Sequence, residues 1–456
     1  MSSSPESAVT ARLKSGSGRG DPMPRNSVPL ETSSDEVIVH KVVSLGDGLK
    51  AGQYALVRSP SMRLFEVPTA YLHQLAQVSP SRASWRNNAY ALAYWLNYCT
   101  AAGVDWRYAS VDDLIAFKNA MEVSVSAQTG QVLSAGTIAQ RMTAVIQYYA
   151  DGETAGWYAG NISDEAGRTQ QRHIPIDADP LAHTRQGNRI THAASKLVPP
   201  PLPVGTGIRP FAIRELRALL ETIGPTATER DKDDLRPTRD RLMIDWGWVV
   251  GLRISEMLGL GVYQFLALTP DTNAPWQHSA VTVLGKGNKP RSVSVPNWLI
   301  HDTVAYINGE RAAILRVGGA ARRGASSALF VAGVNAPRPG RPLGTRRVEK
   351  ILSDACISAG LVAHVQRTDP ETRTISVAQV PLHHFHDLRH TYAVLTYHAE
   401  VKAGNSEPWK KIQAQLGHES LQVTINTYLK YVNGHNEFGS ASVRDLVGLK
   451  RGPHGQ

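Results

Sequence analysis

The sequence predicts a mainly α-helical protein with small β-hairpins, an α+β fold divided into two globular parts. Apolar residues recur at three- and four-residue steps within 61–155 and again beyond residue 208, the period of helices with one buried face. They alternate instead on both sides of a Gly-Lys-Gly-Asn-Lys turn at 285–289, as in a hairpin. The proline-rich stretch LVPPPLPVGTG separates the two helical parts.

The composition excludes several classes of protein. At about 150 residues per domain, 456 residues predict two to four domains, and 42% hydrophobic residues are enough for large buried cores. Cys99 and Cys356 are the only cysteines, too few for a disulfide framework or a four-cysteine zinc site. No run of 18 apolar residues and no apolar secretory core occur. We therefore expect a cytoplasmic protein that does not enter a membrane.

Positive charge is concentrated in one region. Of a net charge of +10, residues 281–350 contribute most, with twelve lysines and arginines against three acids. Such a region suits a polyanion, because neutralised phosphates release their counterions. A solubilising surface loop is the alternative explanation.

The N-terminal part predicts a helical binding domain. Residues 1–60 comprise a disordered tail, rich in Ser, Gly and Pro, and a short hairpin over 37–58. Residues 61–155 form the helical domain, with Ser110 as a helix N-cap and a further helix that starts at Ser134 or Ala135. It shows no catalytic constellation, and we expect the aromatic residues on its apolar stripes in its core: Tyr94, Trp95, Tyr98, Tyr148 and Tyr149.

The C-terminal part predicts a larger domain over 208–440. A linker spans 156–207, and a tail over 441–456 includes SASVRDLVGLK, which has the pattern of a short amphipathic helix. Within the domain we expect mostly helices, the hairpin around 285–289, and a second extended stretch, TRTISVAQVPLHHF.

Polar residues in this larger domain are candidates for chemistry. Arg253, in GLRISEML, opens a helix one turn before Glu256, an arrangement that is also common in surface ion pairs. Lys286 lies at the hairpin turn, where a solvated lysine is the alternative. His386 and Arg389, in HHFHDLRHTYAVL, share one helix face and could bind an anionic oxygen together.

Two further candidates follow, and each has an alternative. His418 follows a Leu-Gly turn, and Tyr428 lies ten residues later. A tyrosine nucleophile needs help because its ordinary pKa is near 10, and nearby arginines and histidines around a phosphate would supply it; a core tyrosine is the alternative. The histidines at 383, 384, 386 and 390 could instead bind a metal, although the Glu of His-Glu-x-x-His is absent.

Taken together and in this order, the motifs GLRxSE, GKGNK, HDLRHT, LGH and the following Tyr resemble the tyrosine recombinase or phage integrase family, across about residues 60–440. The resemblance implies a two-domain DNA clamp, with an N-terminal SAM-like helical core-binding domain and a C-terminal tyrosine recombinase catalytic domain. It also implies a site-specific recombinase that integrates, excises or transposes a mobile element without metal or other cofactor.

The resemblance implies a role for each motif residue. Tyr428 would attack a DNA phosphodiester and form a 3′-phosphotyrosyl link, while Arg253 and Arg389 would hold the non-bridging oxygens. His386 and His418 would donate hydrogen bonds to the phosphate, and His386 would also help to remove the tyrosine proton. Lys286 would protonate the leaving oxygen, and Glu256 would orient neighbouring side chains. The spacing of ten from His418 is one longer than in many members, so Tyr431 is a rival nucleophile.

The partner that the resemblance implies is double-stranded DNA, bound by four protomers at two sites, with accessory DNA-bending proteins as a further option. A protein with this partner would be associated with the nucleoid. Basic residues expected to follow the DNA backbone are Lys289, Arg291, Arg322, Arg323, Arg346 and Arg347. A type IB topoisomerase-like enzyme, an idle DNA-binding regulator on the same scaffold, and a metal-dependent hydrolase are the alternative functions.

Overall fold

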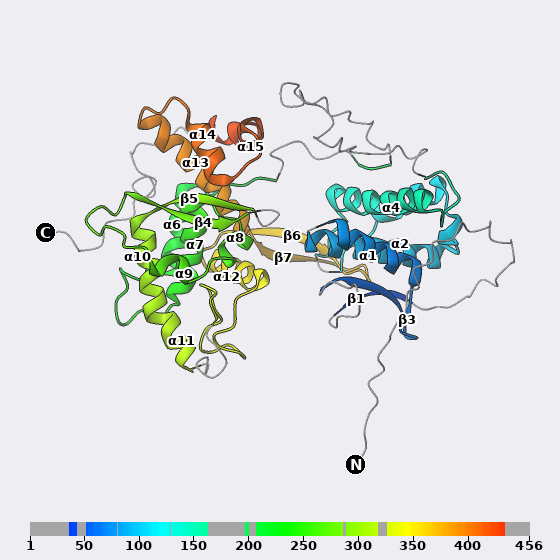
Figure 1. Cartoon of the computed structure of the whole chain (residues 1–456), viewed down its shortest axis with the longest axis horizontal. Helices are drawn as coiled ribbons and strands as arrows, with labels where there is room; N and C mark the ends of the chain where they lie inside the picture. The colour runs from blue at the N-terminus through cyan, green and yellow to red at the C-terminus, as the bar shows by residue number, and fades with distance from the viewer. Residues whose placement is uncertain are drawn as a thin grey trace, which may run out of the picture. The chain divides into compact units, whose positions relative to one another are not determined.

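The computed structural model describes residues 36–42, 52–79, 81–127, 129–162, 197–199, 207–285, 289–317 and 326–433. By its internal contacts the chain divides into two compact units, Met1–Leu202 and Pro203–Gln456 (Figure 1). Each unit has its own cluster of buried hydrophobic residues. Of the expected segments, the tail 1–35, most of the linker 156–207 and the tail 441–456 lie outside the described residues.

Unit 1 combines a small antiparallel sheet with helices. The sheet has the strand order β1-β2-β3 and includes a third strand beyond the hairpin predicted over 37–58. Its elements are β1 (Glu36–Lys41), β2 (Tyr54–Ser59), β3 (Arg63–Leu64), α1 (Glu66–Val78), α2 (Arg82–Ala102), the short 3-10 helix η1 (Trp106–Tyr108), α3 (Val111–Glu122) and α4 (Ala135–Ala155).

Helix capping in unit 1 follows the sequence closely. Ser110 and Asp113 form a reciprocal capping box at α3, which confirms the predicted N-cap. Helix α4 begins at Ala135, and Ser134 caps it by accepting from the backbone N–H of Thr137. Helix α2 begins at Arg82, and its cap is Ser81, whose hydroxyl oxygen accepts from the backbone N–H of Ser84.

Most of the predicted aromatic core of unit 1 is buried. Trp95, Tyr148 and Tyr149 are fully buried, and the indole N–H of Trp95 donates to the Tyr149 hydroxyl at 2.9 Å. The expectation for Tyr94 is wrong, since its side chain is exposed at the edge of the stripe. The Arg141 guanidinium lies 3.9 Å from the centre of its ring, a cation–π contact that covers the ring from outside.

Unit 2 is mainly helical with two two-stranded antiparallel sheets, β4-β5 and β6-β7. Its elements are α6 (Ile213–Ile223), α7 (Thr238–Val250), α8 (Ile254–Leu258), α9 (Tyr263–Leu266), β4 (His278–Leu284), β5 (Pro290–Pro296), α10 (Asn297–Tyr306), the π-helical turn η4 (Ile307–Arg311), α11 (Ala312–Val317), α12 (Thr345–Ser358), β6 (Val362–Thr368), β7 (Ile375–Pro381), α13 (Phe385–Lys402), α14 (Pro408–Leu416) and α15 (Leu421–Asn433).

The hairpin β4-β5 is confirmed around the predicted turn. Val281 pairs with Val293 across the ladder, and both valines are buried while their neighbours along the strands face outward. The predicted extended stretch is β7, which pairs with β6 into a second ribbon. The sequence did not predict β6, which precedes the turn at 369–374.

Helices α7 and α13 cross in the core of unit 2, and Gly247 lets them approach. A Cβ at Gly247 would lie 2.8 Å from Leu388 Cδ1, so any larger residue would push the two helices apart. Helices α13, α14 and α15 contact one another at one end of this unit, drawn orange to red in Figure 1. Helix α13 thus contacts α7 in the core as well as α14 and α15 at this end of the unit.

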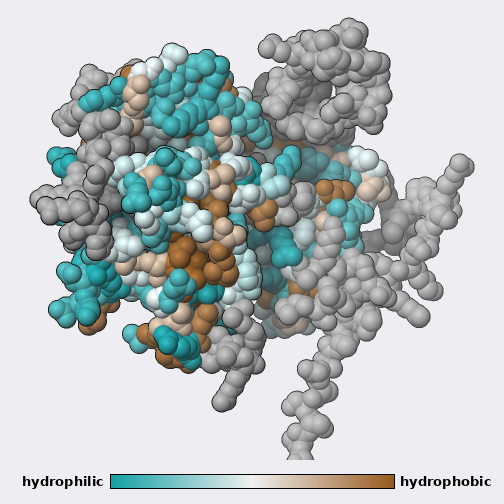
Figure 2. Space-filling view, turned by 60° about the vertical axis from the view of Figure 1, so that its left-hand side comes forward, coloured by the Kyte–Doolittle hydropathy of each residue, from teal (hydrophilic) through white to brown (hydrophobic). Residues whose placement is uncertain are grey.

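The face of the molecule drawn in Figure 2 is largely polar. Figure 2 shows one face on which hydrophilic residues are frequent and hydrophobic residues gather in a limited area near the centre. None of the described helices is both long enough and apolar enough to span a membrane.

Candidate active site

Arg253 is presented by the bend between α7 and α8. Gly251 ends α7 with a left-handed backbone (φ 74°), and Arg253 is the N-cap of α8. Its backbone N–H donates to Glu256 Oε2 at 2.9 Å, and its Nη1 donates to Glu256 Oε1 at 2.8 Å. The side chain stays 32% exposed, so the same guanidinium is also open to a ligand.

Glu256 is a buried carboxylate shared by arginines. Besides Arg253, Arg291 Nη2 on β5 donates to Glu256 Oε2 at 2.9 Å, and Arg389 Nη1 lies 3.8 Å from the same oxygen. Burial alone would raise the pKa of this carboxyl, but the hydrogen bonds from Arg253 and the charges of Arg291 and Arg389 outweigh it and lower the pKa. Glu256 is therefore ionised and holds the guanidiniums together.

Arg389, on α13, is fixed almost without exposure to solvent. Its Nη1 donates to the Gly251 carbonyl and its Nη2 to the Leu416 carbonyl, both at 2.6 Å, and the residue is 1% exposed. Burial and the nearby charge of Arg253 lower its pKa to about 10, so it remains a cation at neutral pH. A guanidinium has five N–H donors, and these two bonds leave others for an anionic oxygen.

Tyr428 lies on α15 next to these arginines. The residue is 1% exposed, and its hydroxyl lies 3.0 Å from His390 Nδ1. Burial raises the pKa of the phenol to about 12, while Arg389 and Arg253 act in the opposite direction. The phenol is therefore protonated at neutral pH, and two cations are close enough to stabilise negative charge on its oxygen.

Two histidines flank this group. His386 is exposed on the first turn of α13, and its ring centre lies 4.6 Å from that of His390. The ring of His418 lies nearly parallel to the Tyr428 ring with 6.2 Å between centres, and its Nδ1 is 2.8 Å from the hydroxyl oxygen of Thr424. Partial desolvation of its ring and the charges of Arg389 and Arg253 lower the pKa of His386. Burial and the same two charges lower the pKa of His418 to about 4.

The structure brings together all the described residues that the sequence marked as catalytic or supporting: Arg253, Glu256, His386, Arg389, His418 and Tyr428. Lys286 lies outside the described residues. Its neighbour Gly285 is close to the site, because a Cβ there would lie 3.8 Å from Glu256 Oε1. Of the rival tyrosines, Tyr428 is buried among these groups, and Tyr431 is partly exposed on the same helix.

The residues expected to follow DNA occupy different environments. Lys289 is exposed at the start of the β5 side of the hairpin, and Arg346 and Arg347 are exposed on the first turn of α12. Arg291 is instead held inside the site, since it also donates through Nη1 to the Gln415 carbonyl. Arg322 and Arg323 lie outside the described residues.

The sequence did not predict two contacts of the site, that of His390 with Tyr428 and that of Arg291 with Glu256. The sequence suggested His390 only as a metal ligand, although its place four residues after His386 puts it on the same helix face. Arg291 was predicted as a DNA contact, and no local pattern ties it to Glu256. Both contacts join residues far apart in the chain.

The histidine cluster is divided among different roles. His383 is buried against Phe211, with ring centres 3.7 Å apart, and its Nε2 lies 3.3 Å from Glu215 Oε2. His384 is exposed, and its backbone N–H is bonded to Asp387. Within the described ranges, no group of three or more His, Cys, Asp or Glu side chains has the arrangement of a metal site.

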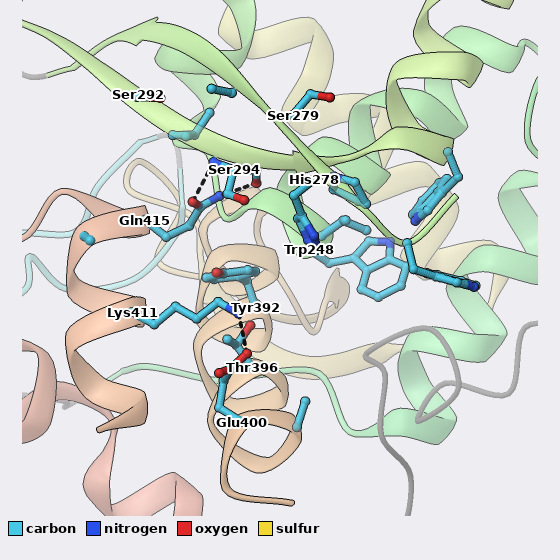
Figure 3. Close-up of a pocket in the computed structure, with 18 residues that line it drawn as sticks. Trp248, His278, Ser279, Ser292, Ser294, Tyr392, Thr396, Glu400, Lys411 and Gln415 are labelled. Atoms are coloured by element: carbon cyan, nitrogen blue, oxygen red, sulfur yellow. Dashed lines mark hydrogen bonds and ion pairs between the residues drawn. The ribbon is translucent and has the colours of Figure 1, made fainter. Parts of the chain in front are cut away.

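A separate cavity of about 660 Å³ lies beside the site, between β4-β5 and helices α13 and α14 (Figure 3). Trp248, His278 and Tyr392 line it, and an ion pair joins Lys411 to Glu400 there. Gln415 lies between the cavity and the arginine cluster: its side-chain amide accepts from the backbone N–H of Ser294 and donates to the Ser294 carbonyl, and its own carbonyl accepts from Arg291 Nη1. None of the described catalytic candidates lines this cavity.

Comparison with known proteins places the second unit in a family. Residues 214–434 match the model of the phage integrase family. The tyrosine recombinase XerC of Mycobacterium tuberculosis is 28% identical over 177 residues, which are 37% of this chain and 55% of that protein. XerC of Salmonella typhi is 28% identical over 221 residues, 47% of this chain and 56% of that protein. The chain thus spans about half the length of the curated relatives it matches.

Among solved structures, the recombinase XerH bound to a palindromic difH substrate aligns with a TM-score of 0.46 at 17% identity, over 81% of this chain and 87% of that one. The matched family region contains every described catalytic candidate, from Arg253 to Tyr428. Residues 214–434 of this chain thus match the phage integrase family, and the relatives matched in sequence are tyrosine recombinases.

Proposed function

We propose that this protein cleaves and rejoins DNA strands, with Tyr428 as the nucleophile. The observation that carries the proposal is the position of the Tyr428 phenol, next to the two arginine cations of Arg253 and Arg389 and between His390 and His418. Paired guanidiniums match the oxygens of a phosphate, and a DNA phosphodiester presents two such non-bridging oxygens.

The proposed reaction is a phosphoryl transfer to tyrosine. Tyr428 Oη bonds to the phosphorus while the bond to the 5′-oxygen breaks, giving a 3′-phosphotyrosyl link and a 5′-hydroxyl. Arg253 and Arg389 stabilise the charge that builds up on the non-bridging oxygens, because they are held in place before the substrate arrives. His386 and His418 donate hydrogen bonds to the same phosphate, and Lys286 supplies the proton to the leaving oxygen.

The covalent link conserves the energy of the broken bond. A 5′-hydroxyl from a second duplex can therefore attack it and rejoin the strand, which makes the enzyme a recombinase of double-stranded DNA. We propose four protomers on two DNA sites, serving the integration, excision or transposition of a mobile element. The exposed residues Lys289, Arg346 and Arg347 supply backbone contacts, consistent with the positive charge of 281–350.

Covalent capture tests the proposal. Wild-type protein and the variants Tyr428→Phe and Tyr431→Phe are incubated with a library of nicked duplexes in EDTA, and DNA in denaturant-resistant adducts is sequenced. A nick near the cleaved bond lets the short 5′-hydroxyl fragment diffuse away, which traps the adduct. We expect adducts from wild type and Tyr431→Phe and none from Tyr428→Phe.

The other outcomes are equally informative. Loss of adducts only in Tyr431→Phe would move the nucleophile to that residue. Salt-sensitive DNA binding without any adduct from wild type would contradict the proposal and favour an idle DNA-binding regulator.

A further inference from the structure

A row of three side chains leads from the surface of unit 2 to the nucleophile. His386 and His390 are one turn apart on α13, with ring centres 4.6 Å apart and ring planes at 87°. Tyr428 follows, with its ring centre 5.5 Å from that of His390. His386 is exposed, whereas His390 is 7% and Tyr428 is 1% exposed. His390 therefore separates a solvent-exposed histidine from a buried phenol.

The hydrogen bond at the inner end of the row is specific. The Tyr428 hydroxyl lies 3.0 Å from Nδ1 of His390, and no other hydrogen bond to that hydroxyl occurs among the described residues. The resemblance to the recombinase family had suggested His386 as the group that helps with the tyrosine proton. His386 contacts the ring of His390 instead.

The charges around His390 favour its neutral form. On α13 it faces His386, Asp387 and Arg389, and it also faces His418 before α15 and Tyr428 on α15. Burial and His386 lower the pKa of His390 to about 3, against the opposite effect of Asp387. A neutral imidazole bonded to a protonated phenol accepts that hydrogen bond through its unprotonated nitrogen, which is Nδ1 here.

We propose that His390 is the general base that accepts the phenol proton when Tyr428 attacks. This inference rests on the proposed function. As the bond between Tyr428 Oη and phosphorus forms, the Oη–H bond breaks and its proton moves to Nδ1 of His390, while the leaving 5′-oxygen takes a proton from Lys286. The incoming phosphate stabilises the resulting imidazolium.

A base is needed at this position because the phenol is a poor nucleophile when protonated. Burial raises its pKa to about 12, so little phenolate exists at neutral pH. General base catalysis by a positioned side chain contributes about 10²- to 10⁴-fold to such steps. A more acidic phenol should depend less on a general base. If His390 takes up the proton, the rate lost on replacing it should therefore shrink as the phenol becomes more acidic, whereas the loss of a merely structural hydrogen bond should not depend on phenol acidity.

The test combines a base variant with a more acidic nucleophile. Adduct formation on a nicked duplex is timed in single turnover for wild type, His390→Gln and His386→Gln, each with either tyrosine or 3,5-difluorotyrosine at position 428. Glutamine at 390 keeps a polar partner for the hydroxyl but takes up no proton. We expect His390→Gln to slow adduct formation by about a hundredfold with tyrosine, and by less than tenfold with difluorotyrosine.

Further results decide the matter. His386→Gln, the matched control one turn away, should show the same defect with both tyrosines. An equal defect with both tyrosines in His390→Gln, an unchanged rate, or a faster rate would each overturn the role of His390, while wild-type adducts would still support the proposed function. Absence of adducts from wild type would overturn both. His390→Asn is the second variant if thermal unfolding shows that His390→Gln is not folded.

Discussion

Glu256 is the residue on which the geometry of the site most depends. It is 3% exposed and accepts hydrogen bonds from Arg253 and Arg291, with Arg389 close by. Three cations so close together would repel one another without it. Removing one member of such a buried cluster lowers the free energy of unfolding, because the charges of the remaining members are left uncompensated.

We predict that Glu256→Gln lowers the free energy of unfolding at pH 7 by about 3 kcal/mol. Because the folded protein lowers the pKa of this carboxyl, its ionisation stabilises the fold above the ordinary glutamate pKa. That stability is lost as the pH falls through the lowered value, so the variant and wild type should converge in acid.

Urea unfolding at pH 7 and at pH 3 measures this difference. Glu371→Gln, at an exposed turn between β6 and β7, is the control and should change stability by less than about 0.5 kcal/mol. A Glu256→Gln deficit that stays constant down to pH 3 would show that its charge is not the cause.

At the scale of elements, the bend between α7 and α8 joins the two arginines of the site. Gly251 ends α7 at positive φ, its carbonyl accepts from Arg389, and Arg253 begins α8 two residues later. A Cβ at Gly251 would lie 2.7 Å from Leu416 Cδ2 and 2.8 Å from Tyr392 Cδ1. The bend thus requires glycine for both its backbone angle and its space.

We predict that Gly251→Ala destabilises unit 2 by at least about 2 kcal/mol and slows adduct formation, because it displaces the carbonyl that holds Arg389. Gly404→Ala is the matched control. It also has positive φ (82°) but has no atom within 4 Å of the added Cβ, so it should cost about 1 kcal/mol. Thermal unfolding and single-turnover adduct formation measure both effects, and equal losses in the two variants would contradict the role of packing at Gly251.

At the scale of the whole molecule, each unit has its own large hydrophobic core among the described residues, and a smaller third cluster in unit 2 includes Tyr392, Leu416 and Tyr428. The core of unit 1 includes Trp95 and Tyr149, and that of unit 2 includes Trp246 and Leu388. All the residues of each of these two large cores belong to a single unit. Two such units can unfold in separate steps, so a single midpoint does not describe the chain.

We predict that Trp95→Ala lowers the stability of unit 1 by about 3–5 kcal/mol, because it empties the centre of that core and removes the N–H that donates to the Tyr149 hydroxyl. Scanning calorimetry should show one transition shifted down and the other unchanged. Trp246→Ala should shift the other transition. A single transition that moves equally in both variants would show that the two cores unfold as one.

Local sequence patterns predicted much of this protein. Helix period and polar caps, such as Ser110, depend on residues a few positions apart, and these interactions are the same in any fold. The described catalytic candidates were recognisable for a related reason, since each lies in a short motif: Arg253, His386, Arg389, His418 and Tyr428.

Only the tertiary structure decided which of these residues contact one another. The sharing of Glu256 by Arg253 and Arg291, the bond between His390 and Tyr428, and the exposure of Tyr94 all depend on how elements pack. Such contacts join positions far apart in the chain, and the helices between them set the distance. A sequence read locally specifies which groups are available, and packing determines which of them meet.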